Sequence, residues 1–174
     1  IGIELLPDVA KMASFRINQG SFFEKPAKIE TVVGDSTKNE TKNQVLEILK
    51  KNERKHFQLI IMHPPYHDII KFSKREDDLS NANSIDEFLK MFGNVVDNFI
   101  DLLENNHFLA IVIGDKYTNS EWIPLGFLTL QETLKRGKDK IFLKSIIIKN
   151  MNNNRAKINQ QNLWRYRALT GGFY

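Results

Sequence analysis

The residues best suited to chemistry are the tetrapeptide His63-Pro64-Pro65-Tyr66, which directly follows the apolar run at residues 57–62. Such a run predicts a strand, so the tetrapeptide is expected at the edge of a sheet. Prolines donate no backbone hydrogen bond and fix φ, and they therefore hold nearby carbonyl groups pointing outward. Pro-Pro-aromatic triplets also occur in polyproline ligands, but those lie in extended polar segments. The tetrapeptide is thus predicted to form a rigid hydrogen-bond acceptor site beside an aromatic ring.

Polar side chains end four of the predicted strands: Glu4, Asp35, His63 and Asp115. In open α/β sheets, ligands bind beyond the carboxyl ends of the strands. Glu4 could accept hydrogen bonds from both hydroxyls of a ribose, or it could cap the helix predicted to begin at Pro7. Asp35 could accept the exocyclic amine of an adenine, or Asp35 or Ser36 could cap the next helix. The residues alone leave both pairs of alternatives open.

The elements that position these residues alternate along the chain. Apolar runs predict strands at residues 1–5, 29–33, 57–62, 108–113 and 142–148, and helical periodicity predicts helices at 7–19, 37–51, 84–103 and 125–135. Thr37 with Glu40, and Ser84 with Glu87, have the spacing of capping boxes. The alternation predicts an α/β fold, namely a doubly wound, mostly parallel sheet with helices on both faces.

Two segments carry further expectations. The run at 57–62 is apolar apart from Gln58, which predicts cover on both faces of its strand. The polar segment at 71–83 is predicted to be a mobile loop that could close over the site. Residues 1–149 are expected to form the core of the catalytic domain, and residues 150–174 a basic, polar C-terminal segment.

Composition excludes several classes of protein. An apolar content of 41% with 26% charged residues is typical of a globular domain, and no apolar run is long enough for a membrane span. The absence of cysteine excludes disulfides and thiolate metal sites, which fits the cytoplasm. His67 stands beside Asp68, but His56 and His107 lie elsewhere in the chain. No metal site is therefore predicted, and His67 is expected to face solvent or to pack within a loop.

Positive charge is concentrated toward the C-terminus. Residues 135–174 carry ten basic side chains and one acidic side chain, whereas residues 1–134 carry 15 basic and 20 acidic ones. This asymmetry favours a polyanionic partner, although a solvated basic face is the alternative. The basic residues suited to phosphates stand among amides and aromatic residues that suit unpaired bases: Arg155, Lys157, Arg165 and Arg167.

Taken together, Glu4, Asp35 and the tetrapeptide resemble, in this order, the motifs of S-adenosylmethionine-dependent DNA methyltransferases that modify adenine N6 or cytosine N4. The stretches at residues 114–117, 123–126 and 159–167 extend the resemblance over most of the chain. Two features depart from the family pattern. The glycine-rich loop is expected just upstream of Ile1, and His63 stands where the family usually has Asp, Asn or Ser.

The resemblance implies a role for each site residue. Glu4 and Leu5 would hold the ribose of S-adenosylmethionine, Asp35 and Ser36 its adenine, and His63 would also contact the cofactor. The tetrapeptide would hold a target base flipped out of the duplex. Lys116 and the four basic residues of the C-terminal segment would contact DNA.

This assignment implies a mechanism. Acceptors aimed at the two protons of an aromatic amine free its lone pair for attack on the sulfonium methyl group, and the Pro64 carbonyl and His63 would be these acceptors. Tyr66 would stack on the base. Histidine accepts a hydrogen bond only when it is neutral, so activity is expected to fall as the pH decreases through about 6.5.

Several alternatives concern substrate and partners. An RNA or protein amide methyltransferase would use the same acceptor site, and a non-catalytic nucleic-acid-binding relative would fit His63 and the missing loop. The expected partner is DNA, and no association with a membrane is expected. The resemblance also allows a homodimer, a cognate restriction endonuclease and a location at the nucleoid. The sequence does not distinguish adenine from cytosine or identify the DNA site.

Overall fold

The computed structural model describes residues 1–18 and 28–149 of the chain. The chain divides into two compact units, Ile1–Phe142 and Leu143–Tyr174. All helices and strands of the described residues lie in the first unit, and residues 143–149 of the second unit form neither. Among the described residues, no helix is long and apolar enough to cross a membrane.

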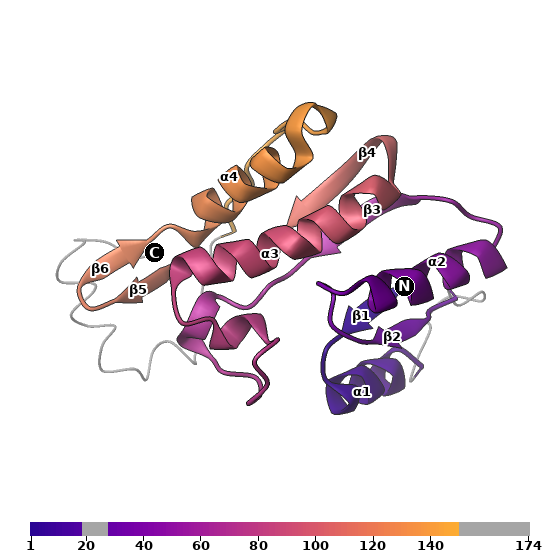
Figure 1. The fold of residues 1–174 in the computed structure, drawn as a ribbon, viewed down its shortest axis with the longest axis horizontal. Helices are drawn as coiled ribbons and strands as arrows, with labels where there is room; N and C mark the ends of the chain where they lie inside the picture. The colour runs from indigo at the N-terminus through magenta and orange to yellow at the C-terminus, as the bar shows by residue number, and fades with distance from the viewer. Residues whose placement is uncertain (19–27, 150–174) are drawn as a thin grey trace. The chain divides into compact units, whose positions relative to one another are not determined.

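The strands and helices of the first unit alternate over most of its length (Figure 1). In chain order they are β1 (Gly2–Glu4), α1 (Pro7–Asn18), β2 (Thr31–Val33), α2 (Asn39–Lys51), β3 (Phe57–Met62), α3 (Ile85–Phe99), β4 (Leu103–Ile111), β5 (Lys116–Thr118), β6 (Glu121–Ile123) and α4 (Leu125–Gly137). Short 3-10 turns lie at His67–Ile69, Leu79–Asn81, Ile100–Leu102 and Lys138–Lys140. The predicted α/β class is confirmed.

The described strands form three two-stranded sheets, whereas one doubly wound sheet was predicted. β1 pairs with β2 in parallel, β3 pairs with β4 in parallel, and β5 pairs with β6 as an antiparallel hairpin. The strand predicted at 142–148 is wrong, because the structure gives these residues no helix or strand. An apolar run can pair only where another strand offers a free edge, and sequence periodicity does not report that edge.

The main core lies between α2, α3 and the parallel strands. α3 buries its predicted apolar stripe, and Phe92, Val96 and Phe99 pack with Met62 of β3 and Val32 of β2. The two parallel pairs therefore contribute side chains to one core. Burial of this apolar surface is the main favourable contribution to folding.

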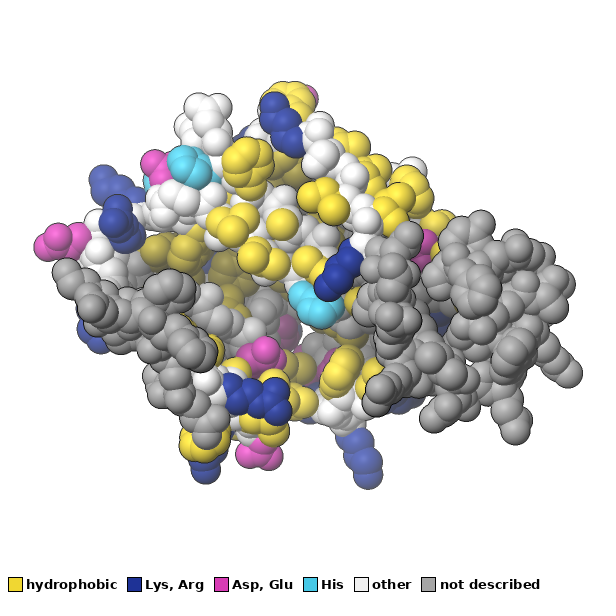
Figure 2. Space-filling model, turned by 180° about the vertical axis from the view of Figure 1, so that it is seen from behind, with side chains coloured by type: hydrophobic (Ala, Val, Ile, Leu, Met, Phe, Trp, Pro, Cys, Tyr) yellow, Lys and Arg dark blue, Asp and Glu magenta, His cyan; other side chains and the backbone are white. Residues whose placement is uncertain are grey.

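One face of the β3–β4 pair is exposed, whereas cover on both faces was predicted. Leu59 and Ile61 of β3 alternate with the core-facing residues and are 53% and 61% exposed. Phe108, the parallel partner of Leu59, is 59% exposed. Figure 2 shows hydrophobic side chains spread over the surface of the described residues. Within the described part of the chain, α3 covers one face only.

Of the two predicted capping boxes, the Ser84 cap is confirmed, with Glu87 bonded to the residue before it, and the Thr37 cap is wrong. The Ser84 hydroxyl accepts the Glu87 N–H at 3.1 Å, and the Glu87 carboxylate accepts the Asn83 N–H at 2.7 Å. α2, however, has Lys38 as its N-cap, with no side-chain cap. Thr37 lies one residue before this cap, and it donates both its N–H and its hydroxyl to Asp35 at 2.8 Å.

Candidate active site

A cavity of about 490 Å³ runs along β1 and β3 and reaches the carboxyl ends of the first three strands. All five residues predicted to bind a cofactor line it: Glu4, Leu5, Asp35, Ser36 and His63. Pro64 and Pro65 line it too. Residues that follow β1, β2 and β3 therefore lie around one cavity, as was expected for the carboxyl ends of parallel strands.

The register of the β1–β2 pair sets the positions of Glu4 and Asp35. Glu4 pairs with Val33, and the Gly34 N–H donates to the Glu4 carbonyl at 2.9 Å, so the two strands end together. Position 34 admits no side chain, because a Cβ there would lie 2.5 Å from the Thr41 hydroxyl oxygen. This close approach of β2 to α2 turns the chain so that Asp35 reaches the cavity.

Asp35 forms a tight turn rather than the alternative helix cap. Its two carboxylate oxygens each accept one hydrogen bond from Thr37, and the Lys38 ammonium lies 4.0 Å away. An ionised carboxylate has about four acceptor positions, so acceptor capacity is left for a ligand. The carboxyl group is buried and held in one orientation, as a binding residue requires.

Asn98 of α3 fixes the same loop from the other side and was not predicted. Its side-chain amide is buried and donates to the carbonyls of Ser36 and Lys38, both at 2.9 Å. Asn98 lies beside the apolar stripe of α3, where a polar residue is usually solvated. Only its placement against the β2–α2 loop reveals the role.

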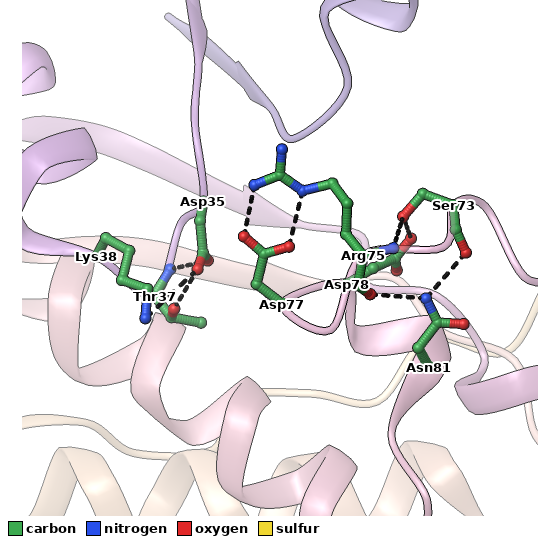
Figure 3. A network of polar contacts seen from close by, with 8 residues as sticks. All are labelled: Asp35, Thr37, Lys38, Ser73, Arg75, Asp77, Asp78 and Asn81. Carbon is green, nitrogen blue, oxygen red and sulfur yellow. Dashed lines mark hydrogen bonds and ion pairs between the residues drawn. The ribbon is translucent and has the colours of Figure 1, made fainter.

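The segment at 71–83, predicted to be a mobile loop, has a hydrogen-bond network of its own and lines the cavity (Figure 3). Asp78 is buried and accepts from the Ser73 hydroxyl at 2.7 Å and from the Ser80 N–H and hydroxyl at 2.8 and 2.7 Å. The Asn81 amide donates to the carbonyls of Ser73 and Arg75. These bonds bring Asp77, Asp78 and Leu79 to the cavity wall.

Asp77 adds a charged group to that wall. The Arg75 guanidinium donates two hydrogen bonds to its carboxylate, at 2.8 and 2.6 Å (Figure 3). This pairing lowers the pKa of Asp77, so the carboxylate is ionised at neutral pH. Four acids line the cavity, Glu4, Asp35, Asp77 and Asp78, and its described lining includes no Lys or Arg. Arg75 offsets the charge of Asp77, and the remaining acids of the lining favour a cationic ligand.

Tyr66 does not line this cavity, and its ring packs against Gly114 in the loop after β4. Its ring lies so close to Gly114 that a Cβ at position 114 would be 2.7 Å from the ring. The rings of His63 and Tyr66 are tilted to one another with centroids 6.0 Å apart. The tetrapeptide thus presents its first three residues to the cavity and its aromatic ring beside Gly114.

Lys116 and His67 lie together in the structure, and both are buried. Lys116 was predicted to contact DNA, but only 8% of it is exposed, and its ammonium is paired with Asp68 and lies 3.1 Å from His67 Nδ1. A phosphate contact requires an exposed cation, so Lys116 is removed from the expected DNA surface. Of the two roles expected for His67, the structure shows packing, since the ring is buried against Phe88.

Asp115, the fourth strand-end residue, serves a structural purpose. Its carboxylate accepts the Trp122 indole N–H at 3.1 Å and the backbone N–H of Gly126 at 3.0 Å. The second bond satisfies a free N–H in the first turn of α4. Asp115 does not line the cavity.

The remaining predicted residues concern DNA and metals. Arg155, Lys157, Arg165 and Arg167 lie outside the described residues. No group of three or more His, Asp or Glu side chains in the described ranges could hold a metal ion.

Parallel strand pairs that alternate with helices define an α/β protein, and such folds bind ligands beyond the carboxyl ends of their strands. A protein-family model described as DNA methylase, N6_N4_Mtase, matches residues 57–169, which is more than half of the chain. The chain therefore belongs to the N6-adenine/N4-cytosine DNA methyltransferase family. The match includes the tetrapeptide and Gly114, whereas Glu4 and Asp35 precede it. No curated protein and no solved structure matches the chain.

Proposed function

We propose that this protein transfers a methyl group from S-adenosylmethionine to the exocyclic amine of a flipped adenine or cytosine in DNA. The observation that carries the proposal is the arrangement of the cavity: His63, Pro64 and Pro65 share it with the acids that end β1 and β2. A methyl donor and an amine must meet, and this cavity joins an acidic ligand site to a rigid acceptor site.

The cavity suits the proposed cofactor chemically. Glu4 would hold the ribose hydroxyls and Asp35 the adenine amine, with Leu5 and Ser36 beside them. S-adenosylmethionine carries a sulfonium cation and supplies an activated methyl group when it is bound. The acidic lining, to which Asp77 and Asp78 contribute, would stabilise that positive charge.

The tetrapeptide would prepare the amine. The Pro64 carbonyl and the His63 ring would accept hydrogen bonds from the two N–H groups of the amine, which draws the lone pair out of the aromatic system and onto the nitrogen. Tyr66 would stack on the extruded base, which offsets part of the few kcal/mol that extrusion costs.

We also propose that the two parallel pairs belong to one doubly wound sheet. Both pairs are parallel, and Val32 of β2 and Met62 of β3 are buried in the same core. This arrangement would place the ends of β1, β2 and β3 along one edge, next to the cavity. The homodimer, the restriction endonuclease partner and the DNA contacts of residues 150–174 stay predictions.

Methyl transfer from labelled S-adenosylmethionine tests the proposal directly. The full-length protein is incubated with duplex DNA, RNA or protein, and the products are digested and analysed by mass spectrometry. We expect N6-methyladenine or N4-methylcytosine in DNA, reduced at least tenfold in Tyr66→Ala. Phe127→Ala, which removes an exposed aromatic ring from α4, is the matched control. Methylation of RNA or protein alone would replace the proposal with the corresponding alternative, and binding without transfer would support a non-catalytic relative.

A further inference from the structure

We infer that Lys116 is a positioning residue for Tyr66: its buried ammonium holds His67 and Asp68, the two residues that follow Tyr66. Gly114, two residues before Lys116, lies against the Tyr66 ring. One short segment would thus hold the aromatic ring and the backbone turn next to it. The inference rests on the proposed function, because Tyr66 matters only where a base stacks on it.

The backbone after Tyr66 needs such support. His67 has a φ of 55°, in the left-handed region that residues with a side chain rarely adopt. A conformation of this kind persists where surrounding contacts hold it. The first place to seek those contacts is the His67 side chain, which is buried.

Both ring nitrogens of His67 have partners. Nε2 lies 3.0 Å from the Ala82 carbonyl oxygen, which can only accept, so Nε2 carries the hydrogen. In the neutral ring Nδ1 is then the acceptor, and the Lys116 ammonium donates to it at 3.1 Å; a carboxylate oxygen of Asp68 also lies 3.1 Å from Nδ1. The ring also meets Phe88 edge-on, at 5.8 Å between centroids. His67 is therefore fixed on three sides.

Asp68 supplies the countercharge that Lys116 needs in this buried place. Its carboxylate accepts a hydrogen bond from the Lys116 ammonium, and that bond is the main reason why the pKa of Asp68 is lowered. The side chain of Lys116 is 9% exposed and that of Asp68 41%. The pair thus joins the first residue of β5 to the turn after the tetrapeptide.

Stability alone gives little reason for such a pair. Replacing a buried ion pair by apolar residues of similar volume is often neutral for stability, whereas removing one partner is costly. What the charged pair does provide is a directional link at a fixed place. His67, Asp68 and Lys116 do not line the cavity, so their effect on the base and their effect on the cofactor can be measured separately.

Cysteine chemistry offers a sharp test, because the chain has no cysteine of its own. In full-length Lys116→Cys, alkylation with 2-bromoethylamine under denaturing conditions, followed by refolding, restores an ammonium on a side chain of lysine length. Alkylation with iodoacetamide gives a neutral adduct as the matched control. Wild type carried through the same refolding sets the reference. The readouts are kcat, the dissociation constant of S-adenosylmethionine, and the fluorescence of 2-aminopurine at the target base.

We expect the neutral adduct to lose at least tenfold in kcat and to give an altered 2-aminopurine signal, with cofactor affinity within about twofold of wild type. The aminoethyl adduct is expected to recover most of kcat. Equal activity of the two adducts would overturn the inference. So would a parallel loss of kcat and cofactor binding, which indicates general misfolding.

A second readout does not depend on activity. The Tyr66 ring resonances of selectively labelled protein, assigned with Tyr66→Phe, are expected to shift in Lys116→Met; unchanged resonances would contradict the inference. If wild type transfers no methyl group to any substrate, the proposed function fails, and the resonances still decide whether Lys116 positions Tyr66.

Discussion

The Tyr66 ring lies against Gly114, with no room between them for a side chain at position 114. A methyl group added at position 114 would lie 2.7 Å from one ring carbon and 3.2 Å from two others. The Tyr66 ring would have to move, because a Cβ is bonded directly to the backbone and cannot turn aside. Position 114 is therefore a sensitive test of how finely the ring is placed.

We expect Gly114→Ala to lower kcat/KM for DNA by about tenfold or more, because base–aromatic stacking is worth about 1–3 kcal/mol. Initial rates at several DNA concentrations measure the effect. Gly126→Ala is the control, since its Cβ would meet only the Asp115 carboxylate at an ordinary 3.5 Å. Wild-type kinetics in Gly114→Ala would show that ring placement does not limit transfer.

Asp77 allows the acidic character of the cavity to be tested at a single residue. Asp77→Asn removes one ionised group from the wall and leaves the Arg75 guanidinium without its carboxylate partner, and we expect the affinity for S-adenosylmethionine to fall about fivefold, which corresponds to about 1 kcal/mol of charge interaction. S-adenosylhomocysteine lacks the sulfonium charge, so its affinity should change less. Calorimetry with both ligands measures the difference.

Glu76→Gln controls for the loss of a charge in the same loop, because Glu76 is exposed and does not line the cavity. Equal losses for the two ligands in Asp77→Asn would mean that Asp77 shapes the loop and does not act through its charge.

At the scale of elements, Asn98 connects α3 to the loop between β2 and α2. Asn98→Ala leaves the Ser36 and Lys38 carbonyls without their buried donor, at a cost of about 1–3 kcal/mol of stability. We expect weaker cofactor binding as well, because Asp35 and Ser36 lie on that loop. Urea unfolding and calorimetry measure the two effects.

Asn94→Ala provides the comparison, since Asn94 is exposed on the same helix one turn earlier. An unchanged cofactor affinity in Asn98→Ala would separate the loop from binding.

The link between β5 and the turn after the tetrapeptide predicts a dependence on pH. Lys116 lowers the pKa of Asp68 in the folded protein, so the pair stabilises the fold at a pH above the ordinary aspartate value of about 3.8. That stabilisation is lost as the pH falls through the lowered pKa, where the folded carboxylate takes up its proton. The loss therefore occurs in the acid range only.

We accordingly expect the free energy of unfolding of wild type to exceed that of Asp68→Asn by a constant amount between pH 5 and 8. The difference should shrink when the pH decreases below about 4. Urea titrations at intervals of half a pH unit test this. A difference that grows on acidification would contradict the assigned pairing.

The elements also show how far a sequence can be interpreted. Local signals worked: the stripe of α3, its Ser84 cap and the apolar run of β3 are properties of neighbouring residues. The capping box at Thr37 failed because α2 begins at Asn39, so that Lys38 and not Thr37 is its N-cap. The strand at 142–148 failed because pairing depends on a distant partner.

The same division holds for the site. Glu4, Asp35 and His63 were predictable because strand ends meet at one edge of a parallel arrangement. Asp77 and Asn98 reach the site from a loop and from the side of a helix. Lys116 appeared to be an exposed cation until its burial beside Asp68 was known. These three depend on tertiary contacts, which no spacing rule encodes.

At the scale of the whole molecule, charge separates the two proposed ligands. Residues 1–134 have a net charge of −5 and hold the acidic cavity, whereas residues 135–174 have a net charge of +9. A cationic cofactor and a polyanionic DNA would thus each be attracted by a different part of the chain. The four basic residues proposed to contact DNA, Arg155, Lys157, Arg165 and Arg167, all belong to the positive part.

Salt dependence measures this attraction, because each neutralised phosphate releases counterions. The slope of the logarithm of the DNA binding constant against the logarithm of salt concentration is about −0.9 for each phosphate contact. Changing these four residues to glutamine is expected to reduce the magnitude of the slope by up to about 3.6, with the affinity for S-adenosylmethionine unchanged. Changing four exposed basic residues at the end of α2, Lys50, Lys51, Arg54 and Lys55, removes the same charge elsewhere. A slope that changes equally in both variants would show that net charge, and not the C-terminal segment, attracts DNA.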